Sequence, residues 1–278
     1  MLYTMKEILT DAQEKGYGVG YFNAVNMEMV RAYIRAAEQC QSPIIIGTAE
    51  ALMPYADFNW IVPIMLEQAR RAKVPVAVHL DHTYNFELLM QALRAGFGSV
   101  MYDGSREKTS EENIRKSAEI VRIAHGMGVG VECELGSVGG LTDSNGKVDQ
   151  MVYTEPEEAK SFVDQTGTDF LAVSIGTCHG VYKATPKLDI PRLREIRKTV
   201  SVPLVLHGGS GVPDDQIAAA VKAGIRKINF GTDVCCSLLD GIRAVDPSIL
   251  ALDLFMQGPT ARVKDFAVSK IKLLGADK

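Results

Sequence analysis

The chain has 278 residues, 46% of them hydrophobic, and a formal net charge of −4 from 30 basic and 34 acidic side chains. This length allows one large core or two small ones, and single α/β barrels commonly run to about 250 residues. Both signs of charge are mixed along the chain, which argues against nucleic acid or a charged membrane surface as partner. No apolar run reaches the roughly 18 residues of a membrane span, and the first residues lack the layout of a signal peptide. Five cysteines without regular spacing favour a reduced, cytoplasmic protein.

Eight short, mostly apolar runs follow one another along the chain, with helical periodicity between them. They cover residues 19–22, 43–46, 76–79, 99–102, 130–133, 170–173, 203–206 and 227–230. Eight β–α units of roughly 25–40 residues predict an α/β fold, a closed parallel (β/α)8 or TIM barrel. We expect a single domain over residues 1–278, with a helix near 4–14 that caps the bottom of the barrel. An open doubly wound sheet would need a glycine-rich fingerprint after the first strand, whereas Gly16, Gly18 and Gly20 precede or enter it.

Three segments between these runs carry signals for the start of a helix. Asn26 precedes an apolar stripe with a spacing of three and four residues and can cap a helix. Thr109 with Glu112, and Thr154 with Glu157, have the spacing of capping boxes. We therefore expect helices to begin at these points.

Four of the five histidines fall at or near the carboxyl ends of predicted strands. His79 and His82 follow the third strand, His179 the sixth and His207 the seventh. In a barrel these strand ends converge on one rim, so His82, His179 and His207 could bind one metal ion and leave positions open for water or substrate. Neutral imidazole favours Zn²⁺, and Co²⁺ or Fe²⁺ would fit the same ligands. His79 lies two residues before Asp81 on the same strand face, hence deeper, and is expected to pack beneath the site.

Carboxylates lie at the neighbouring strand ends. Asp103 ends the fourth strand, and Glu132 and Glu134 share one face at the end of the fifth. A pair of carboxylates beside the histidines suits a second or alternative metal position, with Asp103 and Glu134 as the better candidates. For Glu132, a buried hydrogen-bond network is an equally good interpretation.

Two glycine-rich loops follow the last two predicted strands, at 206–211 and 229–233. Glycines let backbone N–H groups approach an oxyanion closely, and the hydroxyls of Ser210 and Thr232 add donors. The loops after strands seven and eight are the usual phosphate site of a barrel. A phosphate beside a metal ion, with an aspartate between them, suggests chemistry on a small phosphorylated metabolite.

Five segments of the chain, in order, resemble the class II, zinc-dependent ketose-bisphosphate aldolases, whose best-known members act on fructose and tagatose bisphosphates. They are residues 80–83 (LDHT), 131–136 (VECELG), 176–180 (GTCHG), 207–211 (HGGSG) and 229–232 (NFGT). The resemblance implies a (β/α)8 barrel assembled as a homodimer or homotetramer. It also implies reversible cleavage of a ketose 1,6-bisphosphate to dihydroxyacetone phosphate and glyceraldehyde 3-phosphate through a zinc-stabilised enediolate.

The resemblance also assigns roles to individual residues. His82, His179 and His207 match the zinc ligands, and Asp81 matches the acid/base that handles the C4 hydroxyl proton. Asp103 and Glu134 match a secondary metal position. The loops that hold dihydroxyacetone phosphate, often with a monovalent cation (Na⁺ or K⁺) nearby, match Gly180, Gly208, Gly209, Ser210, Asn229, Phe230, Gly231 and Thr232, and Lys183 is expected to meet solvent or a phosphate.

Two departures from the family pattern bear on the substrate. The glutamate that members commonly carry on the loop after Gly139 and Gly140 is absent, and Asp143 could substitute for it. Where many members have an arginine for the distal phosphate, this chain has Ser248, and compensation would have to come from elsewhere in the C-terminal part, with Arg262 and Lys264 as the candidates.

These departures leave three alternatives open. The same chemistry could act on a ketose phosphate that lacks the distal phosphate. A Schiff-base aldolase would need a desolvated lysine, for which Lys227 is a candidate, although a buried ion pair also explains that residue. The third alternative is a sugar-phosphate-binding barrel without turnover.

Overall fold

The structure, a computed structural model, describes residues 1–107, 109–141, 148–149 and 151–277. Eight parallel strands close into a barrel in the order β1, β2, β3, β4, β5, β8, β10, β11 and back to β1. Each predicted strand overlaps one barrel strand, so the predicted (β/α)8 barrel is confirmed. The strands are β1 (Val19–Asn23), β2 (Ile44–Ala49), β3 (Val76–Thr83), β4 (Ser99–Tyr102), β5 (Gly130–Leu135), β8 (Phe170–Val173), β10 (Leu204–Leu206) and β11 (Ile225–Phe230).

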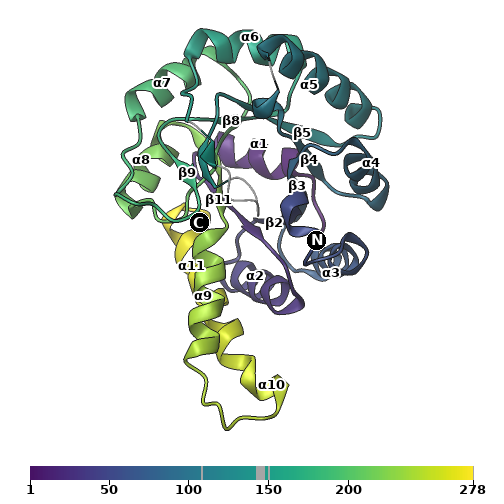
Figure 1. The fold of residues 1–278 in the computed structure, drawn as a ribbon, viewed down its shortest axis with the longest axis vertical. Helices are drawn as coiled ribbons and strands as arrows, with labels where there is room; N and C mark the ends of the chain where they lie inside the picture. Colours follow the sequence, from purple (N-terminus) through teal and green to yellow (C-terminus); the bar gives the residue numbers. More distant parts are fainter. Residues whose placement is uncertain (108, 142–147, 150, 278) are drawn as a thin grey trace.

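A ring of helices surrounds the strands (Figure 1). It consists of α2 (Met27–Cys40), α3 (Phe58–Arg71), α4 (Phe86–Ala95), α5 (Ser110–His125), α6 (Pro156–Thr166), α7 (Ile190–Thr199), α8 (Asp214–Ala223) and α11 (Gln257–Leu273). α11 packs against α2 and against α9 (Thr232–Arg243), which projects away from the ring towards α10 (Leu252–Phe255). Short 3₁₀ helices, η1 (Glu50–Leu52) and η2 (Gly104–Arg106), follow β2 and β4. Within the described part of the chain, no helix has both the length and the apolar character needed to cross a membrane.

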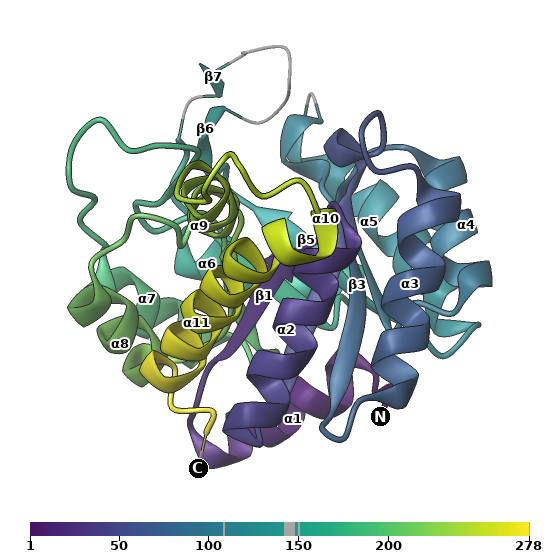
Figure 2. The same ribbon diagram turned by 90° about the horizontal axis from the view of Figure 1, so that it is seen from below.

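The amino-terminal helix α1 (Met5–Lys15) lies across the bottom of the barrel (Figure 2). It begins at a capping box formed by Thr4 and Glu7. Its apolar face, with Met5 and Leu9 fully buried, packs against side chains from β1, β2, β3, β8 and β10 that fill the barrel interior. The bottom is therefore closed by hydrophobic packing, and the opposite end of the barrel is left for chemistry.

Two of the three predicted helix caps are confirmed. The side chains of Asn26 and Thr109 accept hydrogen bonds from backbone N–H groups in the first turns of α2 and α5. Thr154 is wrong as a cap, because α6 begins one residue later, with Glu155 as its N-cap. The buried Thr154 hydroxyl instead donates to the Leu135 carbonyl and accepts from the Ser174 N–H. Long-range hydrogen bonds that join β5 to the segment after β8 have replaced the local cap.

A small second sheet lies at the end of the barrel opposite α1, and the sequence patterns did not predict it. It contains β6 (Gly139–Leu141), β7 (Val148–Asp149) and β9 (Cys178–His179) in the order β7-β6-β9. Figure 2 shows β6 and β7 above the carboxyl end of the barrel. Because β9 contains His179, this sheet helps to hold a candidate metal ligand.

Candidate active site

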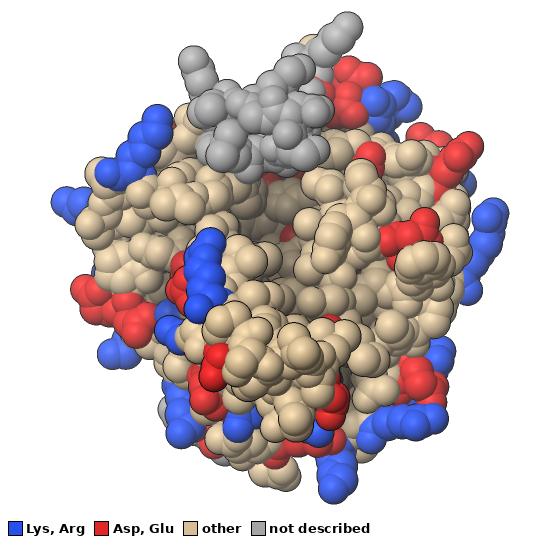
Figure 3. Space-filling view, turned by 60° about the horizontal axis from the view of Figure 1, so that its bottom comes forward, with Lys and Arg blue, Asp and Glu red and all other residues tan. Residues whose placement is uncertain are grey.

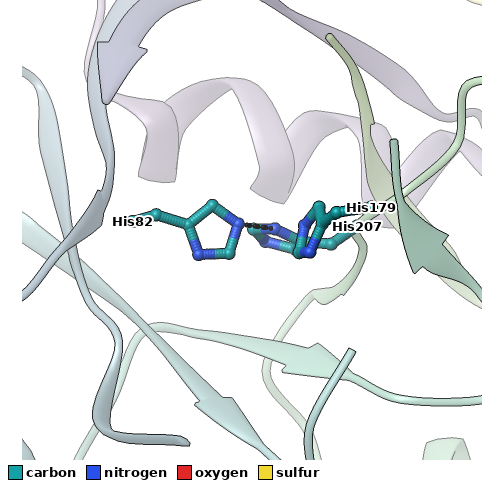
Figure 4. A group of neighbouring side chains, drawn as sticks. All are labelled: His82, His179 and His207. Carbon is teal, nitrogen blue, oxygen red and sulfur yellow. Dashed lines mark hydrogen bonds between the residues drawn. The ribbon is translucent and has the colours of Figure 1, made fainter. Parts of the chain in front are cut away.

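The three histidines from distant parts of the chain converge at the carboxyl end of the barrel (Figure 4). The ring centroids of His82 and His207 are 4.5 Å apart, those of His82 and His179 4.8 Å, and those of His179 and His207 5.9 Å. One nitrogen of each ring lies within 4.8 Å of a nitrogen of the other two. The structure thus brings together the three histidines that were predicted to converge from their positions at strand ends.

A local irregularity in β3 turns His82 towards the other two rings. The pairing of β3 with β4 shifts register between Leu80 and Thr83, and His82 has a φ of +34°. In a regular strand Asp81 and His82 would point to opposite faces. The irregularity lets both line the same cavity. Such a backbone costs on the order of 1–3 kcal/mol for a residue other than glycine and is typical of functional sites.

Hydrogen bonds fix the orientation of two of the rings. His82 Nδ1 lies 2.9 Å from Asp103 Oδ2, and His207 Nε2 lies 2.7 Å from Glu132 Oε1. The other two nitrogens, His82 Nε2 and His207 Nδ1, face each other at 2.7 Å. His179 differs, because neither of its buried ring nitrogens has a hydrogen-bond partner among the described residues.

This arrangement fits a metal ion. Two imidazole nitrogens at 2.7 Å need one proton between them. A metal ion bound by both nitrogens would replace that proton, with the two rings slightly farther apart. Buried nitrogens without a partner, such as those of His179, are otherwise rare. Burial and the charge of His82 lower the pKa of His179 to about 3, so its ring is neutral and free to act as a ligand. Burial would also lower the pKa of His82, but Asp81 and Asp103 outweigh it and raise the value to about 10.

Asp103 and Glu134 lie on the far side of His82 and form a second possible ligand group with it. Asp103 Oδ2 also accepts a hydrogen bond from the Tyr84 hydroxyl at 2.7 Å. Burial opposes ionisation of Asp103, but the hydrogen bond and charge of His82 hold its pKa below the ordinary value. Burial and the neighbouring Asp103 raise the pKa of Glu134 to about 8. Its Oε1 accepts from the Val138 N–H at 3.1 Å, and its buried Oε2 has no hydrogen-bond partner within the described part of the chain.

A fully buried ion pair lies beneath the histidines. Lys227 Nζ is 2.8 Å from Glu132 Oε2 and 3.9 Å from Asp81 Oδ1. Burial would raise the pKa of Glu132, but the ammonium group of Lys227 outweighs it and lowers the value to about 2. Because Lys227 is paired, wholly buried and outside the cavity lining, the structure contradicts its use as a Schiff-base lysine. His79, also fully buried, lies 2.7 Å from Ser99 Oγ through its Nδ1 and lines no part of the cavity.

Asp81 lies between this ion pair and the cavity. Asn229 Nδ2 donates to both of its carboxylate oxygens, at 3.2 and 3.1 Å. Burial would raise the pKa of Asp81, but the positive charges of His82 and Lys227 outweigh it and hold the value well below the ordinary one. The carboxylate is therefore ionised and oriented, as a general base must be.

A cavity of about 420 Å³ opens above these residues. Figure 3 shows the hollow, with mostly uncharged side chains around it. On one side its lining is apolar, with Val25, Ala49 and Leu52. None of the described residues that line it is a lysine or an arginine.

The other side of the cavity is formed by the glycine-rich loops and the start of α9. Gly180, Gly208, Ser210, Gly231 and Thr232 all line it. Gly231 is the N-cap of α9 and provides no side-chain hydrogen bond to the first turn. The Asp233 N–H in the first turn donates to the Ser210 hydroxyl at 3.1 Å. The N-terminus of this helix is otherwise suited to an anion such as a phosphate.

Three of the predicted phosphate-binding residues do not present their groups to the cavity. Lys183 is exposed and lies outside the lining. The Phe230 side chain is buried in the outer core and stacks on Phe22, because alternate residues of β11 face the surrounding helices. The N–H group of Gly209 already donates to the Asn229 carbonyl at 3.0 Å.

The proposed substitutes for the missing family residues lie outside the cavity lining or outside the described residues. Arg262 and Lys264 are on α11, outside the cavity lining, and Ser248 lies in the connection between α9 and α10. Within one chain, therefore, neither Arg262 nor Lys264 supplies a cation to the cavity. Asp143 lies outside the described residues.

Sequence reasoning missed Asn23, Tyr84 and Cys235, which line the cavity. Its position at a strand end, the signal that singled out the histidines, could also have identified Asn23, because it is the last residue of β1. Tyr84 follows β3 directly, but its contact with Asp103 depends on the packing of two neighbouring units. Cys235, in the first turn of α9, had no signal that set it apart from a core residue.

Comparisons with known proteins match nearly the whole chain to aldolases. The profile of the fructose-bisphosphate aldolase class-II family matches residues 3–278. A fructose-bisphosphate aldolase of Thermus caldophilus is 39% identical over 304 residues, which cover 99% of each chain. One of Staphylococcus aureus is 37% identical over 280 residues, 99% of this chain and 97% of the relative. The crystal structure of the YdjI aldolase from Escherichia coli K12 matches with a TM-score of 0.90 at 36% identity, over 100% of this chain and 98% of that one. The chain belongs to the class II fructose-bisphosphate aldolase family, a family of lyases that perform metal-dependent aldol cleavage.

Proposed function

We propose that this aldolase uses zinc to cleave a ketose 1,6-bisphosphate of the fructose or tagatose type to dihydroxyacetone phosphate and glyceraldehyde 3-phosphate. The main support is the convergence of His82, His179 and His207 beside the ionised Asp81, in a cavity that also contains the N-terminus of α9. Metal ligands, a base and an anion site are the three parts that this cleavage requires.

The three histidines would hold the metal ion, with Asp103 and Glu134 as an alternative position next to His82. A bound divalent cation supplies Lewis acidity, which stabilises the negative charge that develops on the donor half of the sugar when the C3–C4 bond breaks. Asp103 and Glu132 orient His82 and His207 through their other ring nitrogens, so that Nε2 of one and Nδ1 of the other are available for coordination.

Asp81 would accept the proton of the C4 hydroxyl during cleavage and return it during condensation. Asn229 keeps the carboxylate in place by donating to both of its oxygens. The aspartate is 3% exposed, so water has little access to the proton that it carries between the two half-reactions.

The phosphate of the donor half would bind next to the N-terminus of α9, at Gly180, Gly208, Ser210, Gly231 and Thr232. This site is beside the histidines, so a bound phosphate would fix the donor carbons relative to the metal. A monovalent cation (Na⁺ or K⁺) near the phosphate stays a prediction.

One observation favours a second candidate, a ketose phosphate without the distal phosphate. The described cavity lining contains no lysine or arginine, and its apolar side offers Val25, Ala49 and Leu52 to the aldehyde half. The two candidates separate in a cleavage assay that compares fructose and tagatose 1,6-bisphosphates with the matching 1-phosphates, each with and without chelator. The bisphosphate proposal expects a higher kcat/KM for at least one bisphosphate. A preference for the 1-phosphates would replace it with the second candidate, and equal activity in chelator would overturn the metal mechanism.

We also propose that the protein works as a homodimer or homotetramer, as its sequence resemblance implies, and in the cytoplasm, as its cysteine usage favours. Size-exclusion chromatography with light scattering, on the metal-loaded protein, tests the assembly. A single species at the chain mass of 30.2 kDa would contradict it.

A further inference from the structure

The side chain of Tyr182 joins the two halves of the candidate site. Its hydroxyl accepts a hydrogen bond from the Cys178 N–H at 2.9 Å and donates one to the Gly208 carbonyl at 2.8 Å. Cys178 directly precedes His179, and Gly208 directly follows His207. One hydroxyl group therefore connects the chain segments of two candidate metal ligands, and one of those segments is also the proposed phosphate loop.

The two segments approach so closely that glycine is required. Gly208 has a φ of +65°, and a Cβ there would lie 2.4 Å from the Cys178 carbonyl oxygen. The ring of Tyr182 packs over Gly211 at the end of the same loop, where a Cβ would lie 3.1 Å from its Cδ2. The phenol is thus enclosed between the His179 segment and the loop, and its hydroxyl has both a donor and an acceptor partner.

His179 depends on this connection more than the other two histidines do. His82 and His207 each have a ring nitrogen held by a carboxylate, whereas both ring nitrogens of His179 lack a partner among the described residues. The position of the His179 ring is therefore set by its backbone. That backbone is held on one side by the pairing of β9 with β6 and on the other by Tyr182.

We propose that Tyr182 is a positioning residue that couples the phosphate loop to the metal site. An anion bound to the loop restricts Gly208, and the hydroxyl of Tyr182 transmits that restriction to the segment that carries His179. The metal then binds more tightly when the anion is already bound, and the anion binds more tightly when the metal is already bound. Thermodynamic linkage requires the same factor in both cases. This inference rests on the proposed metal and phosphate sites, but it concerns binding, so a failure of aldol cleavage would leave it standing.

The test is the Zn²⁺ dissociation constant, measured by competition with a chromophoric chelator, with and without saturating methyl phosphate. Methyl phosphate has the charge of the donor phosphate but no ketone or hydroxyl that could reach the metal. In the unaltered protein we expect it to tighten Zn²⁺ binding by about 5-fold or more. In Tyr182→Phe, which keeps the ring over Gly211, we expect Zn²⁺ binding to weaken by about 10-fold or more and the effect of methyl phosphate to fall below about 2-fold.

Tyr17→Phe is the matched control. Tyr17 is also partly buried, and its hydroxyl donates to Asp11 Oδ2 at 2.7 Å, but it lies at the end of α1, at the bottom of the barrel. This variant should retain both the Zn²⁺ affinity and the full effect of methyl phosphate. The proposal is overturned if methyl phosphate leaves the Zn²⁺ affinity of the unaltered protein unchanged, which needs no variant at all. It is equally overturned if Tyr182→Phe shows the same Zn²⁺ affinity and the same methyl phosphate effect as the unaltered protein.

Discussion

Replacement of Lys227 by methionine tests the buried ion pair beneath the histidines. Methionine fills a similar volume but removes the ammonium group that lies 2.8 Å from Glu132 and 3.9 Å from Asp81. Both Lys227 and Glu132 are 0% exposed, so water cannot replace the lost partner. The variant leaves a buried carboxylate without its counter-charge.

The expected loss follows from this burial. Removal of one partner of a buried ion pair typically costs about 3–5 kcal/mol, because the remaining charge stays desolvated. With an unfolding entropy of about 2.1 cal/mol/K per residue, a chain of 278 residues has about 0.6 kcal/mol/K in total. The melting temperature of Lys227→Met should therefore fall by about 5–9 °C.

The assay is thermal unfolding of metal-free protein in chelator, so that changes in metal affinity do not contribute. The double variant Lys227→Met with Glu132→Gln should be more stable than Lys227→Met alone, because the amide is neutral and its oxygen can still accept from His207 Nε2. A melting temperature within about 2 °C of the unaltered protein would refute the reasoning. So would a double variant that is no more stable than the single one.

Three further outcomes are expected. Asp81→Ala should keep its metal and lose C–C cleavage by about 10²–10⁴-fold, and loss of bound zinc in this variant would contradict the assigned role. Chelator should abolish cleavage while borohydride with substrate leaves the protein unlabelled, and a trapped lysine adduct would contradict the metal mechanism. Asp169→Asn should cost about 1–3 kcal/mol at pH 7 in denaturant titrations. Burial would raise the pKa of Asp169, but the hydrogen bonds from His125 and Lys6 hold it below the ordinary value. The stabilisation by Asp169 is thus present above its unfolded pKa of about 4 and is lost as the pH falls through its lower folded pKa. A stability difference between the variant and the unaltered protein that is as large at pH 2 as at pH 7 would contradict the assignment.

The sequence was most informative about features that depend only on periodicity and on the order of elements along the chain. Eight apolar runs spaced by helical segments predicted the eight barrel strands, because parallel strands buried on both faces leave a continuous apolar signal. Histidines at strand ends were grouped correctly because a closed barrel brings all carboxyl ends to one rim. The Thr154 cap was wrong because long-range hydrogen bonds outweighed a local signal.

The order of apolar runs and helical segments by itself determined the barrel, and the resemblance of five sequence segments to a known family indicated the metal-dependent class of chemistry. Only the tertiary structure decided how the candidate site residues are placed and which partners they contact. It separated the Lys227 ion pair from the cavity. A register shift in β3 lets His82 and Asp81 line the same cavity, and His179 is held only through its backbone among the described residues. The tertiary structure also placed the Phe230 side chain in the core, although its neighbours line the cavity. The physical reason is that hydrogen-bond partners, burial and side-chain direction arise between segments far apart in the chain, and no local pattern records them.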